Sequence, residues 1–284
     1  MTLVDPEYVE ARRVLLDALT ALASHSAALV VAGAQAVYLR TGDSDIAVAP
    51  YTTDGDLAVD PASLAPDPAI EAAMRAAGFE LSIKRGHAEP GIWVTSAVIN
   101  GKQVLIPVDL IVPEGFAPPG GRRGARLGPH GNRAARRALG LEAALVDKSP
   151  ITVSALNPAD YRSVTVDVAG VAALMVAKAH KLHDRIASGR PDRQDDKDAA
   201  DGFRMMQVTS PATVGSTLVG LLEHPIAGPP TTAALAYLDE LFGRRGRPGI
   251  QMAARALRVG IPEERVEAIC VAYVAALRAA AGDE

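Results

Sequence analysis

The sequence predicts an α+β protein in which strands and helices share the first 170 residues and helices dominate the rest. Its strongest strand signal is a hairpin. Two apolar runs, 92–99 and 102–112, are joined by Asn100-Gly101, a dipeptide typical of tight hairpin turns. After residue 170 the apolar residues recur at helical spacing. Hydrophobic residues make up 49% of the 284, enough for a sizeable core.

Composition limits the classes of function. The formal net charge is −4, so affinity for nucleic acid has to come from a local basic patch. The single cysteine, Cys270, excludes an internal disulfide framework and a cysteine-based metal site. The sequence has no N-terminal signal pattern, and no apolar run approaches the ~20 residues of a membrane helix. We therefore expect a soluble, cytoplasmic protein with no membrane partner.

The first elements are a helix, a strand and a second helix. Asp5-Pro6-Glu7 is typical of a helix start, with an acidic cap, a first-turn proline and a first-turn acid. The apolar run 27–32 predicts a strand, after which Gly33-Ala34 opens a short helix. A glycine at this junction leaves backbone N–H groups where a phosphate could bind. Ordinary strand-to-helix packing explains the same pattern equally well.

A pair of acids separated by one residue follows. In Thr53-Asp54-Gly55-Asp56, the second acid leads into the apolar run 57–59, and strand alternation would place both carboxylates on one face. Such a pair suits Mg²⁺, whose other ligands are then water and substrate phosphates. Asp-Gly is also a strong turn signal, so a surface turn is the alternative. A second pair, Asp43 and Asp45, lies in a polar loop and ranks lower.

A helix and a strand are predicted before the hairpin. Asp67-Pro68 predicts a helix start and Gly78 its end, and the run 79–84 predicts a strand. In the second strand of the hairpin, Pro107 predicts an edge or a bulge because it cannot donate to a ladder.

The same strand holds an acid, Asp109, between two aliphatic residues. It either faces solvent on an alternating strand or is a third carboxylate that meets Asp54 and Asp56 across neighbouring strands. The sequence leaves both possibilities open.

Residues 117–140 contain no acid and several arginines. We predict a loop around the first three arginines and a helix with the last three on one side. Arginine matches phosphate through paired hydrogen bonds, so contact with a polyanion is favoured over a solvated surface. The arginines are Arg122, Arg123, Arg126, Arg133, Arg136 and Arg137.

A domain boundary is predicted near residue 150, because residues 148–160 have a loop-like composition with Pro150 and Asn157-Pro158. The first domain then covers residues 1–150 and a mainly helical second domain covers 151–284. Residues 163–168 predict one more strand, and helices are expected at 171–188, from Asp196, and near 231–242, 250–259 and 262–281.

A basic ridge is predicted on the helix at 171–188. Lys178 lies in its apolar stripe and shares a side with Lys181 and Arg185. One possibility is that Lys178 extends its ammonium to water along the stripe. The other is that the three cations clamp a triphosphate. Asp198 and Asp201, three apart on the next helix, share a face, so one of them can point inward.

These motifs together resemble the polymerase-β-like nucleotidyltransferase superfamily. The resemblance rests on a strand followed by Gly33-Ala34, then T-T-D-G-D-L at 52–57 and I-P-V-D-L-I-V at 106–112. The segments K-x-x-K-L-H-D-R at 178–185 and K-D-A-A-D at 197–201 narrow it to the AbiEii-type and MenT-type nucleotidyltransferase toxins. The resemblance covers residues 29–201 and leaves the last eighty without a match.

The resemblance implies a mixed sheet with flanking helices, completed by a helical lobe at the active-site cleft. It also implies transfer of a nucleoside monophosphate from a nucleoside triphosphate to the 3′ end of tRNA, which would block translation. Mg²⁺, with Mn²⁺ as the alternative, would be held by Asp54, Asp56 and Asp109. The nucleotide would contact Gly33, Ala34, Thr53, Lys181 and Arg185, with Lys178 and Asp198 catalytic, the arginines on tRNA, and an antitoxin protein as partner.

Two other functions stay open. The acceptor could be a protein hydroxyl or a small molecule, with the same chemistry. Alternatively, the chain is a catalytically degenerate member that only binds RNA or a partner.

Overall fold

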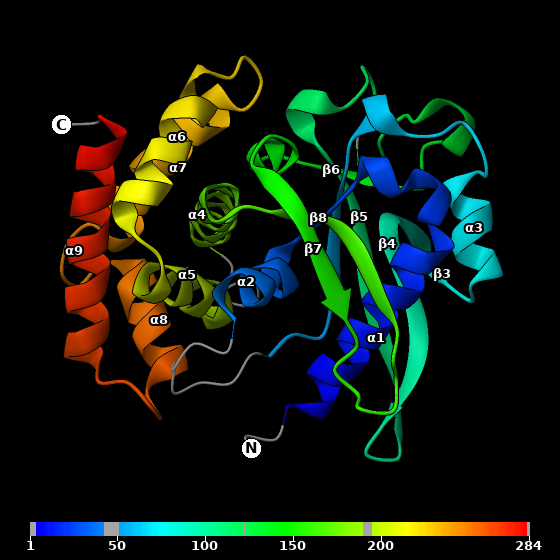
Figure 1. The fold of residues 1–284 in the computed structure, drawn as a ribbon, viewed down its shortest axis with the longest axis horizontal. Coiled ribbons are helices and arrows are strands. Elements are labelled where there is room, and N and C mark those ends of the chain that lie inside the picture. The colour runs from blue at the N-terminus through cyan, green and yellow to red at the C-terminus, as the bar shows by residue number, and fades with distance from the viewer. Residues whose placement is uncertain (1–3, 43–50, 122, 190–194, 283–284) are drawn as a thin grey trace. The chain divides into compact units, whose positions relative to one another are not determined.

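The described residues form an α+β fold built on a mixed sheet, as the sequence predicts (Figure 1). The computed structural model describes residues 4–42, 51–121, 123–189 and 195–282. Within them the strand order is β3-β4-β5-β2-β1-β8-β7, and β6 pairs with β5 outside this path. The strands are β1 (Leu29–Ala32), β2 (Gly55–Val59), β3 (Glu80–Lys84), β4 (His87–Ile99), β5 (Lys102–Pro113), β6 (Arg136–Ala138), β7 (Lys148–Ser154) and β8 (Ser163–Ala169).

The predicted hairpin is confirmed as β4 and β5, which pair antiparallel from Ile99 and Lys102 at the turn. Asn100 and Gly101 both have positive φ, 51° and 76°, as the turn that matches strand twist requires. Pro107 lies where β5 has one partner strand, because β2 pairs with β5 only from Val108 onward. Its missing N–H therefore costs no ladder bond on that side.

The sheet is mixed because its central strands form both parallel and antiparallel pairs. β1 pairs antiparallel with β2 and parallel with β8, and β2 pairs parallel with β5. Long segments that contain several elements connect β2 to β5 and β1 to β8, as parallel pairing requires.

Two segments differ from the sequence prediction. Residues 148–154, expected to be loop, form β7, which pairs antiparallel with β8 at the end of the sheet order. Pro150 is tolerated there because an edge strand has one side without a ladder. Arg136 and Arg137, expected on a helix, lie in β6 and pair with β5 instead. Their backbone bonds to β5 outweigh a weak local helix preference.

Three helices accompany the first part of the sheet: α1 (Pro6–Ala21), α2 (Gly33–Thr41) and α3 (Ile70–Ala76). The predicted start of α1 is confirmed, since Asp5 Oδ1 accepts the Glu7 N–H at 2.8 Å. Helix α1 packs its buried leucines against β4 and β5. Helix α3 begins at Ile70, slightly later than Asp67-Pro68 suggested, with Ala69 as its cap.

The C-terminal part is helical, as predicted. Its helices are α4 (Val171–Ala187), α5 (Asp196–Val208), α6 (Pro211–Glu223), α7 (Gly228–Phe242), α8 (Pro248–Leu257) and α9 (Glu263–Ala281). Helix α6 was not predicted from the sequence. Short 3₁₀ helices lie at η1 (Ala23–Ala28), η2 (Pro61–Ser63), η3 (Glu114–Phe116), η4 (Gly128–His130) and η5 (Glu142–Leu145).

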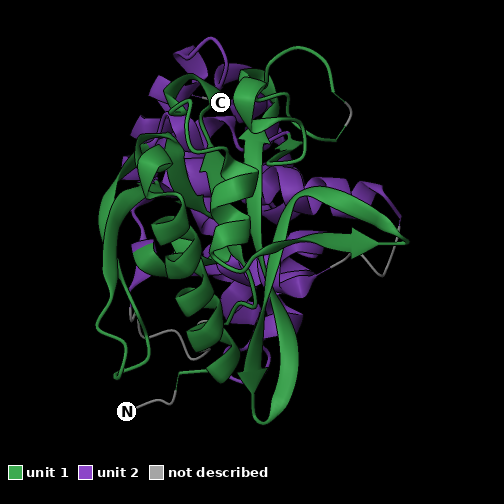
Figure 2. Ribbon diagram, turned by 90° about the vertical axis from the view of Figure 1, so that its right-hand side faces the viewer, with its two compact units in different colours: residues 1–39, 49–138, 148–169 green, residues 40–48, 139–147, 170–284 purple. Residues whose placement is uncertain are grey.

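The chain divides into two compact units, coloured separately in Figure 2. Unit 1 comprises residues 1–39, 49–138 and 148–169 and holds the whole sheet. Unit 2 comprises residues 40–48, 139–147 and 170–284 and holds α4 to α9. The units are assembled from discontinuous segments, whereas the predicted domains, 1–150 and 151–284, are continuous. That division stays a prediction, because packing alone does not say which part folds independently.

No helix within the described ranges has the length and apolar character needed to cross a bilayer.

Candidate active site

A pair of carboxylates lies on one face of the sheet in unit 1. Asp56 of β2 is in register with Asp109 of the parallel strand β5 and with Ala32 of β1. Residues in register on adjacent strands project from the same face, so Asp56 and Asp109 project together. Helix α1 covers the other face, where Leu15 Cδ1 lies 3.3 Å from the position of a Cβ at Gly55. The carboxylate face is thus opposite the α1 core.

The first residue of α2 lies against this face. Gly33 has φ +63°, and a Cβ placed on it would overlap Asp56 Oδ2. The Asp56 carboxylate therefore occupies the space that any side chain at Gly33 would need. Ala34 is buried, so it can offer a ligand its backbone and not its side chain.

We expect Gly33→Ala to destabilise the protein by more than Gly78→Ala. Both glycines have positive φ, so each alanine meets the left-handed strain of about 1–2 kcal/mol, but a Cβ at Gly78 meets no atom within 4 Å. The additional loss of unfolding free energy in Gly33→Ala measures the clash with Asp56. Urea unfolding of the two variants and of Gly33→Ala/Asp56→Ala checks it. Equal losses for both glycines, or no relief in the double variant, would contradict the contact.

Asp54 is held by a chain of polar groups. Thr52, which is buried, donates from Oγ1 to Asp54 Oδ1 at 2.5 Å. Gln35 donates from Nε2 to the Asp54 carbonyl at 3.0 Å and accepts from Arg12 Nε at 2.7 Å. Thr53 is half-buried beside them.

Arg12 and Gln35 were not predicted from the sequence as site residues. Arg12 is buried, and its other donors bond Tyr8 Oη and the Ser154 carbonyl. Burial lowers the pKa of Arg12, while Tyr8 raises it. Arg12 thus links α1 to α2 and β7, and through Gln35 it helps to hold the backbone at Asp54. The sequence holds no signal for this role, because Arg12 reads as an ordinary helix residue.

Asp109 is engaged by an arginine. Arg136 donates from Nε and Nη2 to Asp109 Oδ2 at 3.1 and 2.8 Å. In the part of the chain that the structure describes, no group of three or more His, Cys, Asp or Glu side chains could hold a metal ion. The structure thus places Asp109 on the same face of the sheet as Asp56, but the Arg136 guanidinium is bonded to the Asp109 carboxylate. The predicted group of three carboxylates around one metal ion is not seen among the described residues.

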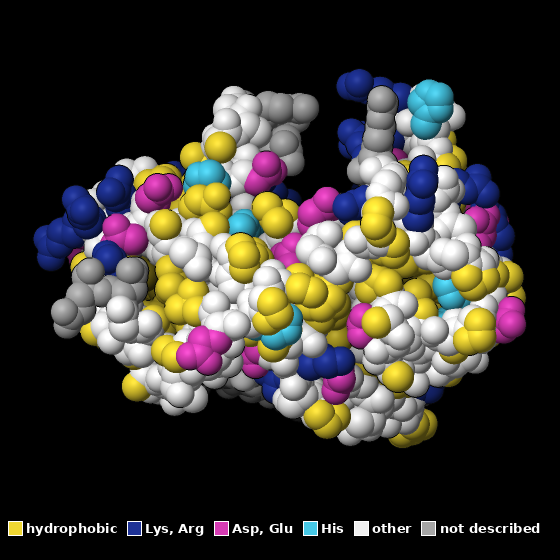
Figure 3. Space-filling model, turned by 90° about the horizontal axis from the view of Figure 1, so that it is seen from above, with side chains coloured by type: hydrophobic (Ala, Val, Ile, Leu, Met, Phe, Trp, Pro, Cys, Tyr) yellow, Lys and Arg dark blue, Asp and Glu magenta, His cyan; other side chains and the backbone are white. Residues whose placement is uncertain are grey.

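The predicted arginine patch is partly neutralised by acids from distant segments. Arg133 pairs with Glu71 at 3.1 Å and Arg137 with Glu114 at 2.6 Å. Arg123 and Arg126 are exposed. On the face seen in Figure 3, basic and acidic side chains are interspersed. Arg122 lies outside the described residues, as do Asp43 and Asp45 of the competing acid pair.

A second charged cluster lies in unit 2. Lys178 of α4 is buried, with its Nζ 2.7 Å from Asp198 Oδ1 and 2.6 Å from Asp201 Oδ2 of α5. Lys181 Nζ lies 3.1 Å from Asp198 Oδ1, and Arg185 pairs with Asp198 Oδ2. The structure thus brings together the predicted residues Lys178, Lys181, Arg185 and Asp198. It also shows that both acids point inward.

The cluster shifts the pKa values of two of its residues, Lys178 and Asp198. Burial alone would lower the pKa of Lys178, but Asp198 and Asp201 outweigh burial and hold it above its usual value. Burial alone would raise the pKa of Asp198, but Lys178, Lys181 and Arg185 outweigh burial and hold it below its usual range. Both shifts favour the charged forms, so Lys178 and Asp198 form a buried ion pair.

We expect the free energy of unfolding to fall below pH ~4 through Asp198. A carboxylate with a lower pKa when folded stabilises the protein above its unfolded pKa, about 3.9, and loses this stabilisation as pH falls. Lys178, whose pKa is raised, loses its contribution only in strong alkali. Asp198→Asn should therefore flatten the acid side of the stability profile, measured by urea unfolding from pH 7 to pH 3.

Asp196, a half-buried acid that pairs with the exposed Arg255 at 2.8 Å, is the matched control for this profile. Solvent screens such an accessible pair and it contributes little, so Asp196→Asn should leave the acid slope near that of the parent. Parallel profiles for the parent and Asp198→Asn would contradict the expectation.

The cations of this cluster differ in access. The Lys178 side chain is 7% exposed, whereas Lys181 is 43% exposed. Arg185 also lies 3.8 Å from the exposed Asp195, so the three cations face three acids. Lys181 and the partly exposed Arg185, and not Lys178, can meet an anion directly.

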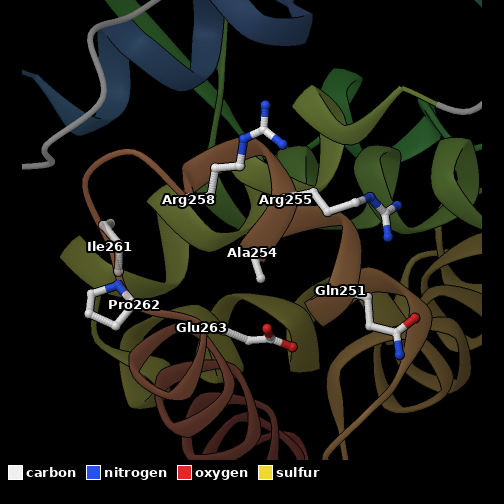
Figure 4. Close-up of a pocket in the computed structure, with 7 residues that line it drawn as sticks. All are labelled: Gln251, Ala254, Arg255, Arg258, Ile261, Pro262 and Glu263. Atoms are coloured by element: carbon white, nitrogen blue, oxygen red, sulfur yellow. The ribbon is translucent and has the colours of Figure 1, made fainter.

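A pocket of about 410 Å³ lies elsewhere in unit 2, between α8 and the start of α9 (Figure 4). Arg255, Arg258 and Glu263 line it. It contains none of the predicted site residues, and Arg255 is already paired with Asp196. We assign it no function.

Comparisons of the sequence with protein-family models and with curated proteins found no match.

Proposed function

We propose that this chain is a cytoplasmic nucleotidyltransferase of the polymerase-β-like type. It transfers a nucleoside monophosphate from a nucleoside triphosphate to the 3′ end of tRNA and so blocks translation. One observation carries the proposal. Asp56 and Asp109 are in register on parallel strands, with Asp54 two residues before Asp56 and the α2 N-terminus against Asp56. The motifs at 178–185 and 197–201 support the toxin-type assignment.

The carboxylates fit a divalent metal. Mg²⁺ is commonly bound by one or two carboxylates, with substrate phosphates and water as the other ligands. Asp54 and Asp56 would supply them, with Mn²⁺ as the alternative ion. The bound ion would neutralise phosphate charge and align the reacting groups. The contacts of Thr52 and Gln35 to Asp54 keep this carboxylate in place before substrate arrives.

The proposed reaction forms a bond from the 3′ oxygen of the acceptor to the α-phosphorus. The bond from the α-phosphorus to the bridging oxygen of the β-phosphate breaks, pyrophosphate leaves, and the hydroxyl proton goes to solvent. Lys181 and Arg185 would neutralise phosphate charge. Lys178 and Asp198 would act as positioning residues, because they form an ion pair with each other. Arg123 and Arg126 are the exposed candidates for the tRNA backbone.

Radiolabel transfer tests the proposal. The protein is incubated with Mg²⁺, total tRNA and each α-labelled nucleoside triphosphate in turn. We expect label in tRNA with at least one nucleotide, and no label in tRNA whose 3′-terminal diol has been oxidised by periodate. Absence of label from intact tRNA with all four nucleotides would overturn the tRNA assignment.

The two alternatives give other outcomes. Label in protein or in a small molecule would favour a different acceptor with the same chemistry. Catalytic degeneracy is favoured by one observation, the capture of Asp109 by Arg136, and predicts no Mg²⁺-dependent nucleotide binding in calorimetry. An antitoxin partner is also proposed, and co-purification of the protein encoded by an adjacent gene checks it.

A further inference from the structure

Arg136 forms an incomplete pair with Asp109. An arginine and a carboxylate commonly bond through two nitrogens and two oxygens. Here Nε and Nη2 both donate to the single oxygen Oδ2. The Arg136 side chain is 30% exposed, and within the described residues its Nη1 makes no hydrogen bond. The guanidinium therefore keeps donors available for a second anion.

The position of Arg136 puts these donors at the carboxylate face. Arg136 of β6 is in register with Ile111 of β5, two residues beyond Asp109 and on the same face. Asp56 adjoins Asp109 on β2. Arg136 therefore pairs with Asp109, the carboxylate that lies next to Asp56 on the sheet. The sequence predicted instead that Arg136 is one of the arginines that hold tRNA.

We propose that Arg136 binds a phosphate of the incoming nucleotide and leaves Asp109 as it does so. This inference rests on the proposed function and names a phosphate contact within the same site. Phosphate offers oxygens that match the guanidinium fork. Once Arg136 has left, the Asp109 carboxylate loses this cation beside the carboxylate of Asp56, which favours binding of a divalent cation there. Nucleotide and metal therefore bind cooperatively, and Asp109 becomes a metal ligand only when nucleotide is present.

Calorimetric binding of inorganic tripolyphosphate and of the four nucleoside triphosphates tests the exchange, without turnover. We expect Arg136→Gln to weaken binding of tripolyphosphate with Mg²⁺ about tenfold, the effect of a lost charge-assisted fork. Asp109→Asn should strengthen tripolyphosphate binding in EDTA by a similar, roughly tenfold factor, because the guanidinium is released. Misfolding cannot produce this gain.

The matched controls are Arg162→Gln and Asp17→Asn, from another ion pair of unit 1, at 2.6 Å. Neither should change tripolyphosphate binding. Parent-like binding by Arg136→Gln, or weaker binding by Asp109→Asn, would make the pair merely structural and overturn the inference while the proposed function stands. If the parent protein binds none of the probes, the proposed function and the inference fail together.

Discussion

Asp56→Asn is expected to reduce Mg²⁺-dependent label transfer by at least about 100-fold while the protein stays folded. Asparagine keeps the shape against Gly33 but removes the charge that a divalent ion needs. Loss of several kcal/mol of charge stabilisation in the transition state corresponds to this factor. The transfer assay measures the rate, and circular dichroism with urea unfolding confirms the fold.

Asp60→Asn is the control for this variant. Asp60 follows the same strand, and its carboxylate caps η2 by accepting the Ala62 N–H at 3.0 Å, a role that asparagine also fills. Its activity should equal that of the parent. Parent-like activity of Asp56→Asn would mean that the Asp43 and Asp45 pair, or neither pair, is the metal site.

Lys178→Met is expected to lower the free energy of unfolding by about 3–5 kcal/mol. Methionine fills the same volume but leaves Asp198 and Asp201 buried with one cation fewer, and removing one partner of a buried ion pair has this cost. Urea unfolding followed by circular dichroism measures the loss at neutral pH, where Lys178 and Asp198 are charged.

Lys181→Met, on the same helix and next to the same carboxylate, should cost no more than about 1 kcal/mol because its ammonium is exposed. The triple variant Lys178→Met/Asp198→Asn/Asp201→Asn should recover part of the loss, since no uncompensated charge stays buried. Equal, small losses for both lysines would mean that Lys178 is not the centre of the cluster.

Much of the fold could be predicted from short stretches of sequence. The Asn100-Gly101 turn, the Asp5 cap of α1 and the helical spacing of α4 each correspond to one observed element. Local signals work here because a turn or a cap depends on a few neighbouring residues.

The elements that were missed depend on distant partners. β7 contains Pro150 and resembles a loop until β8 pairs with it. α6 contains two glycines and several β-branched residues, which weaken helix propensity. Its Gly215 lies against Ala280 of α9, where a Cβ would overlap. Packing against α9 therefore favours the small residue that the local helix preference opposes.

In the candidate site too, some residues could be found from local sequence and others only from the folded structure. Sequence alone singled out Asp109 as an acid in an apolar strand and Lys178 as a lysine in an apolar stripe, because each conflicts with its surroundings. Asp54 and Asp56 were found from their spacing, and Asp198 from its place on the helix and from the resemblance. The sequence could not pair these residues with their partners: Arg136 was predicted to bind tRNA, and Arg12 and Gln35 look like ordinary helix residues until folding places them near Asp54.

By itself, the sequence determined the α+β class, the main helix starts, the hairpin and the identity of the charged residues. Only the tertiary structure determined which charged side chains are neutralised by an ion-pair partner. Lys178 is taken up by two buried acids, Lys181 faces solvent, and Asp109 is held by Arg136. The physical reason is that periodicity assigns a side chain to a face, whereas burial and the choice of ion-pair partner depend on segments far apart in the chain.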